Sequence, residues 1–254
     1  MKLDGKVALV TGSARGLGWE MIQAFAQEGA RVTLCDLSQS DVDEATAELR
    51  LPAERILAVK SDVTSEPDVA DLFRRVLGKF KRLDVLVNNA GFACPRGGPV
   101  NLELAETPLD VWLKVLDTNL TGTFLCSREA LKIMRPQGGG AIINISSPQG
   151  KKAKRLRGPY CAAKFGVEGL TQALALENAG YNIQVNSLDP GGIVATEAIR
   201  QIPGNRGVRM LAPEIVRPCA VYLASDESSG RTGGSFVCTD WNTAHRLEVP
   251  YTVA

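Results

Sequence analysis

A tyrosine and a lysine four positions apart, Tyr160 and Lys164 in YCAAK, are the residues whose types and spacing most directly suggest chemistry. Side chains at positions i and i+4 of a helix project from one face, so both groups can act on the same small molecule. A free phenol has a pKa near about 10, and an ammonium within roughly 4 to 6 Å favours the phenolate. We therefore expect Lys164 to lower the pKa of Tyr160 and make it a proton acceptor. The alternative is an ordinary amphipathic surface helix.

A glycine-rich turn follows the first predicted strand. Residues 6–11, KVALVT, form a continuous apolar run, which is typical of a strand buried on both faces of a parallel sheet. The sequence TGSARGLG then precedes a predicted helix over residues 19–28. Because glycine lets backbone amides approach a phosphate at the positive end of a helix, this order predicts a dinucleotide site, with a tight turn as the alternative. The residues expected there are Gly12, Arg15, Gly16, Leu17 and Gly18.

The second predicted strand, residues 31–35, ends at Asp36, about twenty residues past the glycine turn. A carboxylate at this place accepts hydrogen bonds from ribose hydroxyls and repels the 2′-phosphate of NADP, so Asp36 and its neighbour Leu37 favour NAD. Arg15 could pair with a 2′-phosphate, but we weigh Asp36 more heavily. The alternative for Asp36 is a turn residue before a predicted helix over residues 40–50.

Strand and helix patterns alternate along the rest of the chain. This alternation predicts an α/β fold with a doubly wound parallel sheet, of Rossmann type, and helices on both faces. A length of 254 residues suits a single domain over residues 1–254, with a substrate loop at about 192–212 and an irregular tail over 241–254. The further predicted strands are 55–60, 83–87, 141–146, 182–188 and 235–238, and the further predicted helices are 66–79, 109–134, 159–179 and 213–224.

Polar and small residues follow several of these strands. Ligands of open α/β sheets bind beyond the carboxyl ends of the strands, so these residues are expected to line the cofactor site. They are Asp62, Val63, Asn89, Ala90, Gly91, Pro190, Gly191 and Ile193. Ser147 follows the strand 141–146, where its hydroxyl can face Tyr160; without the tyrosine it would be a loop hydroxyl. Asn119, taken alone inside a helical run, is predicted to be structural.

Composition limits the classes of function. The net charge of +1, with 44% hydrophobic and 22% charged residues, argues against nucleic acid or membrane surfaces as partners and favours small molecules. Six scattered cysteines and a single histidine, His245, make a metal site unexpected. The sequence shows no secretory segment and no apolar run of about 18 residues, so we expect a cytoplasmic protein with reduced thiols.

Five cations stand within the segment KKAKRLR, which we call the basic segment: Lys151, Lys152, Lys154, Arg155 and Arg157. Charge runs are usually solvated, and the alternative is an electropositive rim that attracts an anionic substrate. A second group of cations, Arg200, Arg206 and Arg209, lies in the predicted substrate loop.

In combination and in order, the motifs resemble the short-chain dehydrogenase/reductase family over about residues 6–240. The resemblance rests on TGSARGLG, Asp36, Asp62-Val63, NNAG, Asn119, Ser147, YCAAK and PGGI. It implies a catalytic tetrad in which Tyr160 is the acid/base and Ser147 holds the reacting oxygen. Lys164 would bind the nicotinamide ribose and lower the pKa of the tyrosine, and Asn119 would keep a water in the proton relay. It also implies a homodimer or homotetramer.

We therefore expect an NAD-dependent oxidoreductase that interconverts a secondary alcohol and a ketone by hydride transfer, with an anionic substrate of the sugar acid or polyol type. The alternatives are an NADP-linked 3-oxoacyl-type ketoreductase and a non-catalytic nucleotide-binding regulator. The basic segment is atypical for the family, and two further departures from the family pattern stand out. Thr196 lies six residues past Pro190 where the family has a threonine at five, and TDWN at 239–242 replaces the family's Asp-Gly-Gly.

Overall fold

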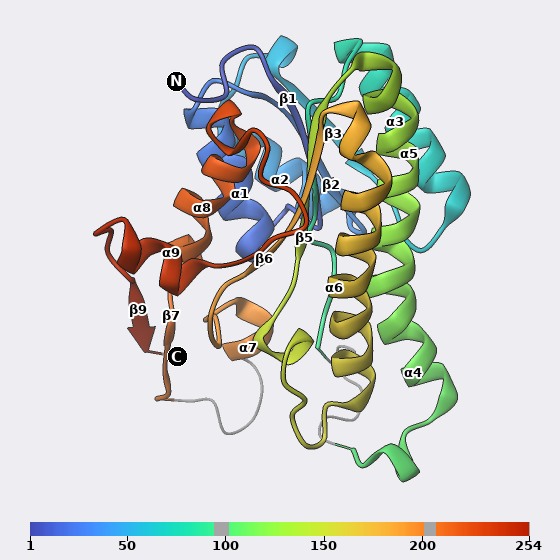
Figure 1. The fold of residues 1–254 in the computed structure, drawn as a ribbon, viewed down its shortest axis with the longest axis vertical. Helices are drawn as coiled ribbons and strands as arrows, with labels where there is room; N and C mark the ends of the chain where they lie inside the picture. The colour runs from blue at the N-terminus through green and yellow to red at the C-terminus, as the bar shows by residue number, and fades with distance from the viewer. Residues whose placement is uncertain (94–101, 201–206, 254) are drawn as a thin grey trace.

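The computed structural model describes residues 1–93, 102–200 and 207–253. Its centre is a parallel sheet in the order β3-β2-β1-β4-β5-β6-β8 (Figure 1). The strands are β1 Val7–Thr11, β2 Arg31–Asp36, β3 Ile56–Lys60, β4 Val85–Asn88, β5 Gly140–Ile145, β6 Ile183–Asp189 and β8 Ser235–Val237. Every residue of β1 and β4 is buried, because helices cover both faces of the sheet. The predicted doubly wound α/β architecture is confirmed.

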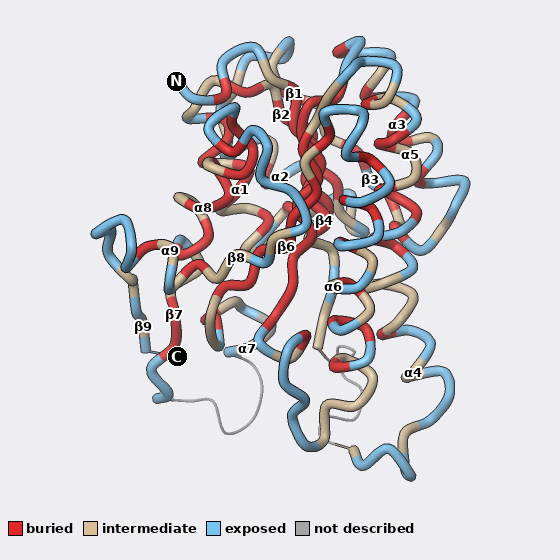
Figure 2. The backbone as a smooth tube through the Cα atoms, viewed as in Figure 1, coloured by how far each residue is buried: buried red, intermediate tan, exposed pale blue. Residues whose placement is uncertain are grey.

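Two layers of helices enclose the sheet (Figure 1). One face carries α1 Gly16–Gln27, α2 Gln39–Leu49 and α8 Arg217–Ala224, and the other carries α3 Glu66–Phe80, α5 Gly122–Gln137 and α6 Gly158–Asn178. Each layer has its own apolar core, with Phe25 buried in the first and Phe73 in the second. Figure 2 shows the buried backbone concentrated in the sheet and on the helix sides that face it.

The long helix expected over residues 109–134 is interrupted. It consists of α4 Leu109–Leu116, a π-helical turn Asp117–Thr121, and α5, which continues to Gln137. The predicted helical run is confirmed, and the sequence did not reveal the π turn inside it because the apolar pattern carries through the turn without a break. Asn119 lies in the turn and is buried.

The C-terminal tail expected to be irregular contains two elements. Helix α9 spans Cys238–Ala244, and β9 Tyr251–Val253 pairs antiparallel with β7 Arg209–Leu211. The Trp241 ring packs 4.3 Å from the Tyr222 ring and stacks 3.9 Å from His245, measured between centroids. The prediction of an irregular tail was wrong, because β9 is too short to be recognised without its distant partner strand.

Two further boundaries differ from the predictions. The helix expected over residues 213–224 begins as a 3₁₀ turn, Pro213–Val216, before α8. A short helix, α7 Glu197–Arg200, lies in the predicted substrate loop, of which residues 201–206 are outside the described part. No helix in the described ranges is long and apolar enough to cross a membrane, and the same ranges hold no cluster of three potential metal-binding side chains.

Candidate active site

A cleft of about 1890 Å³ opens at the carboxyl ends of the strands. Its volume exceeds the roughly 300–1,000 Å³ of ordinary small-molecule sites, which leaves room for a dinucleotide together with a second ligand. The predicted residues that line it are Gly12, Arg15, Gly16, Leu17, Asp36, Leu37, Asp62, Val63, Asn89, Ala90, Gly91, Asn119, Ser147, Tyr160, Lys164, Pro190 and Ile193. Residues far apart in the sequence are thus gathered in one place, as the strand-end argument predicted.

Gly18 and Gly191 are not among the lining residues and have packing roles instead. A Cβ atom on Gly18 would lie 2.3 Å from the carbonyl oxygen of Gly12, so only glycine lets α1 pack against the turn. Gly191 has φ +89°, and a Cβ there would lie 2.2 Å from Oγ1 of Thr239. Both glycines shape the wall of the cleft from behind, and their contact with a cofactor stays a prediction.

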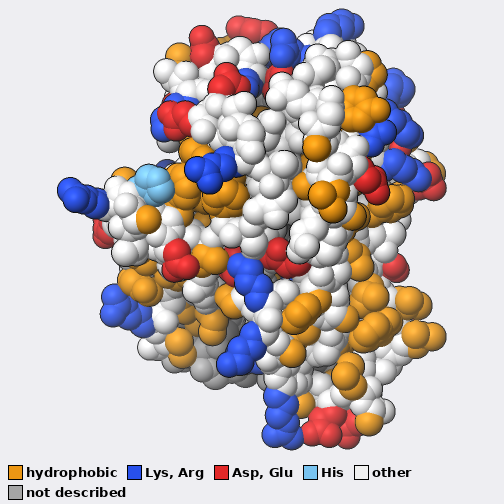
Figure 3. All heavy atoms as spheres, viewed as in Figure 1, with side chains coloured by type: hydrophobic (Ala, Val, Ile, Leu, Met, Phe, Trp, Pro, Cys, Tyr) orange, Lys and Arg blue, Asp and Glu red, His pale blue; other side chains and the backbone are white. Residues whose placement is uncertain are grey.

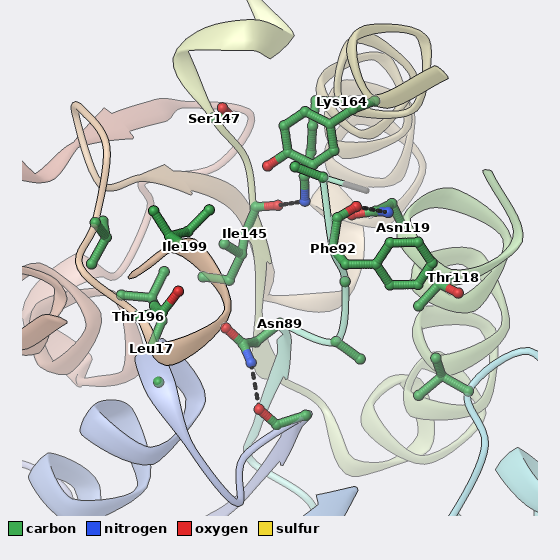
Figure 4. Close-up of a pocket in the computed structure, with 18 of the residues that line it drawn as sticks. Leu17, Asn89, Phe92, Thr118, Asn119, Ile145, Ser147, Lys164, Thr196 and Ile199 are labelled. Carbon is green, nitrogen blue, oxygen red and sulfur yellow. Dashed lines mark hydrogen bonds between the residues drawn. The ribbon is translucent and has the colours of Figure 1, made fainter. Parts of the chain in front are cut away.

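The glycine turn between β1 and α1 faces the cleft, and hydrogen bonds from Asn89 hold it in place. Gly12 and Gly16 adopt left-handed φ values of +62° and +59°. Asn89 donates through Nδ2 to the carbonyl oxygens of Thr11 and Gly12, at 2.9 and 2.8 Å. Its amide is therefore used to hold the turn (Figure 4). Helix α1 starts at Gly16, so its first backbone N–H groups are available to an anion in the cleft.

Asp36 lies at the end of β2, next to the glycine turn. Its carboxylate accepts hydrogen bonds from the backbone N–H groups of Ala14, at 3.2 Å, and Leu37, at 2.8 Å. Arg15, the residue that could favour a 2′-phosphate, is within 3.4 Å of Asp41 and 3.9 Å of Glu197. The carboxylate thus has a fixed position in the cleft, and the competing cation is already surrounded by negative charge.

Tyr160 and Lys164 share the face of α6 that lines the cleft, as the four-residue spacing predicts. Lys164 is buried, and its Nζ donates to the carbonyl oxygen of Ile145 at the end of β5, at 2.7 Å (Figure 4). The same Nζ lies 5.5 Å from the centroid of the Tyr160 ring. The helix therefore brings the two groups together, and β5 fixes the lysine.

The two pKa values differ from the sequence-based expectation. Burial raises the pKa of Tyr160 to about 12, and the hydrogen bond from Ser147 opposes this shift without cancelling it. Burial also lowers the pKa of Lys164 to about 8, against the opposing charges of Asp189 and Glu168. The expectation that Lys164 brings the tyrosine pKa toward neutrality is wrong for the protein by itself, because burial dominates the pKa of Tyr160 and Lys164 is not among the groups that shift it.

Ser147 follows β5 and is buried at the entrance to a 3₁₀ turn, Pro148–Gly150. Its Oγ accepts from the backbone N–H of Gln149 at 3.2 Å and interacts with the Tyr160 hydroxyl. Figure 4 shows Ser147 and Lys164 on one part of the cleft wall, with Thr196 and Leu17 across from Ile145. A substrate oxygen between Ser147 and Tyr160 would thus meet two hydroxyl groups.

Asn119 projects from the π turn toward the same cleft. Its Nδ2 donates to the carbonyl oxygens of Phe92, at 3.0 Å, and Val115, at 2.9 Å. Its Oδ1 is buried and has no partner within the described residues, so it can accept a hydrogen bond from a donor in the cleft. Gly91 is required beside it, since a Cβ there would lie 2.4 Å from this Oδ1. Single-turn π-helices often occur at functional sites.

Sequence reasoning did not assign Asp189 to the site. This buried carboxylate accepts from the backbone N–H of Gly191 at 2.9 Å and lies 3.4 Å from Nζ of Lys151. Burial raises the pKa of Asp189, and Lys151 opposes the shift. The position of Asp189 immediately before Pro190, at a strand end, was the signal that could have identified it.

The basic segment divides into paired and unpaired cations. Lys151 pairs with Asp189, and Arg155 pairs with Glu103 at 2.7 Å. Lys152 and Lys154 line the cleft, and neither forms an ion pair with any described residue. Figure 3 shows Lys and Arg side chains along the lower middle of the visible face, over the segment that leads into α6.

The second group of cations does not line the described cleft. Arg200 donates to the carbonyl oxygen of Ala195 at 3.1 Å, and the Arg209 guanidinium lies 4.0 Å from the centroid of the Tyr251 ring. Arg206 lies outside the described residues. Local contacts hold the side chains of Arg200 and Arg209, and the expectation that this group borders the substrate stays a prediction.

The two departures from the family pattern have different outcomes. Thr196 lines the cleft, and its Cγ2 would be 3.4 Å from a Cβ on Gly16, so it faces the glycine turn. The residues of TDWN belong to α9, and none of them is among the described lining residues. The replacement therefore affects packing around Trp241 rather than the floor of the cleft.

A family model for short chain dehydrogenases matches residues 6–206. The cis-4-hydroxycyclohexanecarboxylate dehydrogenase of Sinomonas cyclohexanicum is 38% identical, with 88% of this chain and 91% of the relative covered. A 3-alpha-(or 20-beta)-hydroxysteroid dehydrogenase of Mycobacterium bovis is 39% identical, with coverages of 93% and 88%. The structure of a provisionally assigned gluconate dehydrogenase from Agrobacterium tumefaciens has a TM-score of 0.84 and 35% identity, covering 93% of this chain and 95% of that chain.

The chain therefore belongs to the short-chain dehydrogenase family. Members of this family are oxidoreductases that act on hydroxyl groups with a nicotinamide cofactor.

Proposed function

We propose that this protein is an NAD-dependent dehydrogenase that interconverts a secondary alcohol and a ketone. The observation that carries the proposal is the meeting of Tyr160, Ser147 and Lys164 in the cleft that also contains the glycine turn and Asp36. A nicotinamide cofactor bound there supplies the acceptor or donor of the hydride.

Each residue of the proposed tetrad has a task that its surroundings support. Ser147 orients the substrate oxygen, and Tyr160 takes the alcohol proton or returns it to the ketone oxygen. Lys164 uses one donor on the Ile145 carbonyl, which leaves two of its three ammonium protons for ribose hydroxyls and for the field at Tyr160. Asn119 offers its unpartnered Oδ1 to a water in the proton path.

The cleft suits a dinucleotide along its length. The glycine turn suits a pyrophosphate, because Gly12 and Gly16 have left-handed φ values that favour glycine, and the absence of side chains there lets a phosphate approach the backbone N–H groups. Asp36 would accept from the adenosine ribose, with Leu37, Asp62 and Val63 beside the adenine. The residues assigned to the nicotinamide half are Ala90, Gly91, Tyr160, Lys164, Pro190 and Ile193.

NAD rather than NADP is favoured by the charges around the ribose end. Asp36 is held in place by two backbone N–H groups, so its negative charge stays where a 2′-phosphate would lie. Arg15 could attract that phosphate only by leaving Asp41 and Glu197. Both arrangements disfavour the 2′-phosphate of NADP.

The proposed substrate carries a negative charge and is of the sugar acid or polyol type. Three cations of the basic segment form no ion pair with a described residue, and two of them, Lys152 and Lys154, line the cleft, whereas the third, Arg157, does not. Two of the three similar proteins described above are named for hydroxy compounds with a carboxylate. Asp110 of α4 and Asp117 of the π turn also line the cleft, so the attraction is local to the two lysines and does not come from a general positive field.

We also propose that residues 1–254 act as one domain and assemble as a homodimer or homotetramer. Helices α4, α5 and α6 expose large apolar side chains, among them Leu109, Phe124 and Phe165, which are 70%, 43% and 46% exposed. Figure 3 shows apolar side chains gathered on the side of the molecule where these helices lie. A second copy would cover them. The five described cysteines are free thiols, which suits the reducing cytoplasm.

The direct test is a screen of sugar acids, polyols, hydroxysteroids and hydroxyacyl thioesters with NAD and NADP, followed by the absorbance of the reduced cofactor. We expect turnover of a hydroxy acid with NAD. A preference for NADP with an acyl thioester would favour the ketoreductase alternative. Tight cofactor binding without turnover of any compound would favour a regulator.

A further inference from the structure

One carboxylate on the cleft helix, that of Glu168, accepts hydrogen bonds from three serines on three neighbouring strands. Ser146 directly after β5 donates to Oε1, Ser187 of β6 donates to Oε2 at 2.9 Å, and Ser235 of β8 donates to Oε1 at 3.1 Å. The hydroxyls of Ser187 and Ser235 are also 2.8 Å apart. Glu168 is half-buried and forms no ion pair among the described residues, so hydroxyl groups alone satisfy its charge.

The position of Glu168 relates it directly to the proposed tetrad. Tyr160, Lys164 and Glu168 are spaced at i, i+4 and i+8, so they lie in a row along one side of α6. Lys164 donates to the backbone of Ile145, and Glu168 accepts from the side chain of the next residue, Ser146. The residue after that is Ser147. Lys164 and Glu168 therefore hold Ile145 and Ser146, the two residues that precede Ser147. The hydroxyl of Ser147 is the group proposed to bind the substrate.

The contact between α6 and this segment is close. A Cβ atom on Gly150 would lie 2.9 Å from the carbonyl oxygen of Lys164 and 3.0 Å from Oγ of Ser146. The turn after Ser147 therefore packs directly on the backbone of the helix at Lys164. A small shift of the Ser146 anchor would consequently move Ser147 relative to Tyr160.

Glu168 also contributes charge behind Lys164. The charged groups around that ammonium are Glu168 on its own helix and Asp189 at the end of β6, which is itself paired with Lys151. Both carboxylates raise the pKa of Lys164 against the lowering effect of burial. Asp189 has the larger effect on the pKa of Lys164 although it is paired with Lys151, and Glu168 adds to it without an ion pair of its own among the described residues.

We propose that Glu168 is a positioning residue for the reaction: it anchors the residue after β5, the interior of β6 and the start of β8 to α6, and it supplies negative charge one helical turn from Lys164. The inference rests on the proposed roles of Tyr160 and Lys164. Glu168 touches neither substrate nor cofactor in this scheme, and it acts through Ser146 and Lys164.

The test separates the charge of Glu168 from its anchoring. Glu168→Gln keeps the shape and removes the charge, and Glu177→Gln makes the same charge change at an exposed position of the same helix. In cofactor-free protein with ¹³C-labelled lysine, we expect Glu168→Gln to lower the pKa of Lys164 by about 0.5 to 1 pH unit. The alkaline limb of the kcat/KM profile should move to lower pH by a similar amount. Glu177→Gln should leave both unchanged.

The anchoring is tested with Glu168→Ala and Ser146→Ala. Glu168→Ala should lower kcat by about 10- to 100-fold, because Ser147 loses its fixed position, and Glu168→Asp should restore part of it. Should Glu168→Gln fail to fold, Ser146→Ala still tests the anchor, with a lowered kcat and an unchanged Lys164 pKa expected.

The inference is wrong if the pKa of Lys164 in Glu168→Gln and the kcat of Ser146→Ala both equal the wild-type values. A failure of the proposed function is distinguishable from this result. It would appear as full activity in Tyr160→Phe, whereas a failure confined to Glu168 would leave Tyr160→Phe inactive.

Discussion

The Nζ atom of Lys164 donates to the carbonyl oxygen of Ile145 over 2.7 Å, so the lysine of α6 is tied to β5 two residues before Ser147. This bond fixes the ammonium 5.5 Å from the centre of the Tyr160 ring. It also explains how a lysine can be almost fully buried, since a satisfied donor reduces the cost of removing the charge from water. The remaining cost appears as the lowered lysine pKa.

The role of Tyr160 as acid/base is tested by Tyr160→Phe. We expect turnover to fall by about 10² to 10⁴, because the proton acceptor is removed. NAD affinity, measured by titration, should stay within a few fold, since the ring remains in place. Tyr181→Phe is the control, because that ring is exposed and packs against Arg135. Near-normal turnover in Tyr160→Phe would contradict the assignment.

The buried charge of Lys164 should make the stability of the protein depend on pH. The pKa falls from 10.5 to about 8 on folding, so below pH 8 the ammonium is charged in both states and the burial cost is complete. As pH rises from about 8 to 10.5, the folded protein loses the proton first, and this cost disappears.

Lys164→Met should therefore be more stable than the wild type near pH 7, although inactive. The burial cost is at most about 3 kcal/mol, and the lost hydrogen bond offsets about 1 kcal/mol of it. Urea denaturation of cofactor-free protein at pH 7 and pH 10 measures the difference, which should shrink at the higher pH. Lys132→Met, at a lysine that is 61% exposed, is the control. If the difference in unfolding free energy between Lys164→Met and the wild type is equal at both pH values, burial of the Lys164 charge does not destabilise the folded protein.

Cofactor preference depends on Asp36. Asp36→Ala should weaken NAD and relieve the repulsion of NADP, so that the ratio of kcat/KM values shifts toward NADP by about 10- to 100-fold. Asp43→Ala, at an exposed position in α2, is the matched control. A wild-type protein that already prefers NADP would show that Arg15 outweighs Asp36 despite its contacts with Asp41 and Glu197.

The sequence was sufficient to predict features that depend on local pattern. The apolar strand, the glycine turn and the helix after it are contiguous, and Asp36 follows the next strand, so their arrangement in the cleft follows from the winding of the sheet. The shared face of Tyr160 and Lys164 follows from helical spacing alone.

Features that depend on tertiary packing were not predictable. The pKa values of Tyr160 and Lys164 are set mainly by burial, which no spacing reveals. The π turn at Asn119 leaves the apolar pattern intact, and β9 pairs with β7 more than forty residues earlier. The contacts of Glu168 join three strands, so its role could not be inferred from α6 by itself.

Oligomerisation should bury the apolar surface of α4, α5 and α6. Light scattering at micromolar concentration is expected to give the mass of a dimer or tetramer. Phe124→Glu combined with Phe165→Glu should reduce that mass, because the two exposed rings would be replaced by charges. Leu247→Glu, at an exposed apolar position after α9, serves as the control. A wild-type monomer would refute the proposal.

An anionic substrate should depend on Lys152 and Lys154 and not on their paired neighbours. Neutralising Lys151 would leave the buried Asp189 carboxylate without its cation, so that variant would report stability rather than binding. Lys152→Gln with Lys154→Gln should lower kcat/KM for a hydroxy acid by about 10- to 100-fold and leave a neutral alcohol unaffected. Arg155→Gln, which removes an exposed pair with Glu103, is the control and should have little effect.

Salt provides an independent measure of the same attraction. Raising the ionic strength toward about 0.15 M shortens the Debye length to about 8 Å, so kcat/KM for the anion should fall while kcat stays nearly constant. The double variant should lose most of this dependence, because the two cations that the basic segment contributes to the cleft are gone. A wild-type kcat/KM that does not change with salt for the best hydroxy acid would show that Lys152 and Lys154 are solvated surface charges.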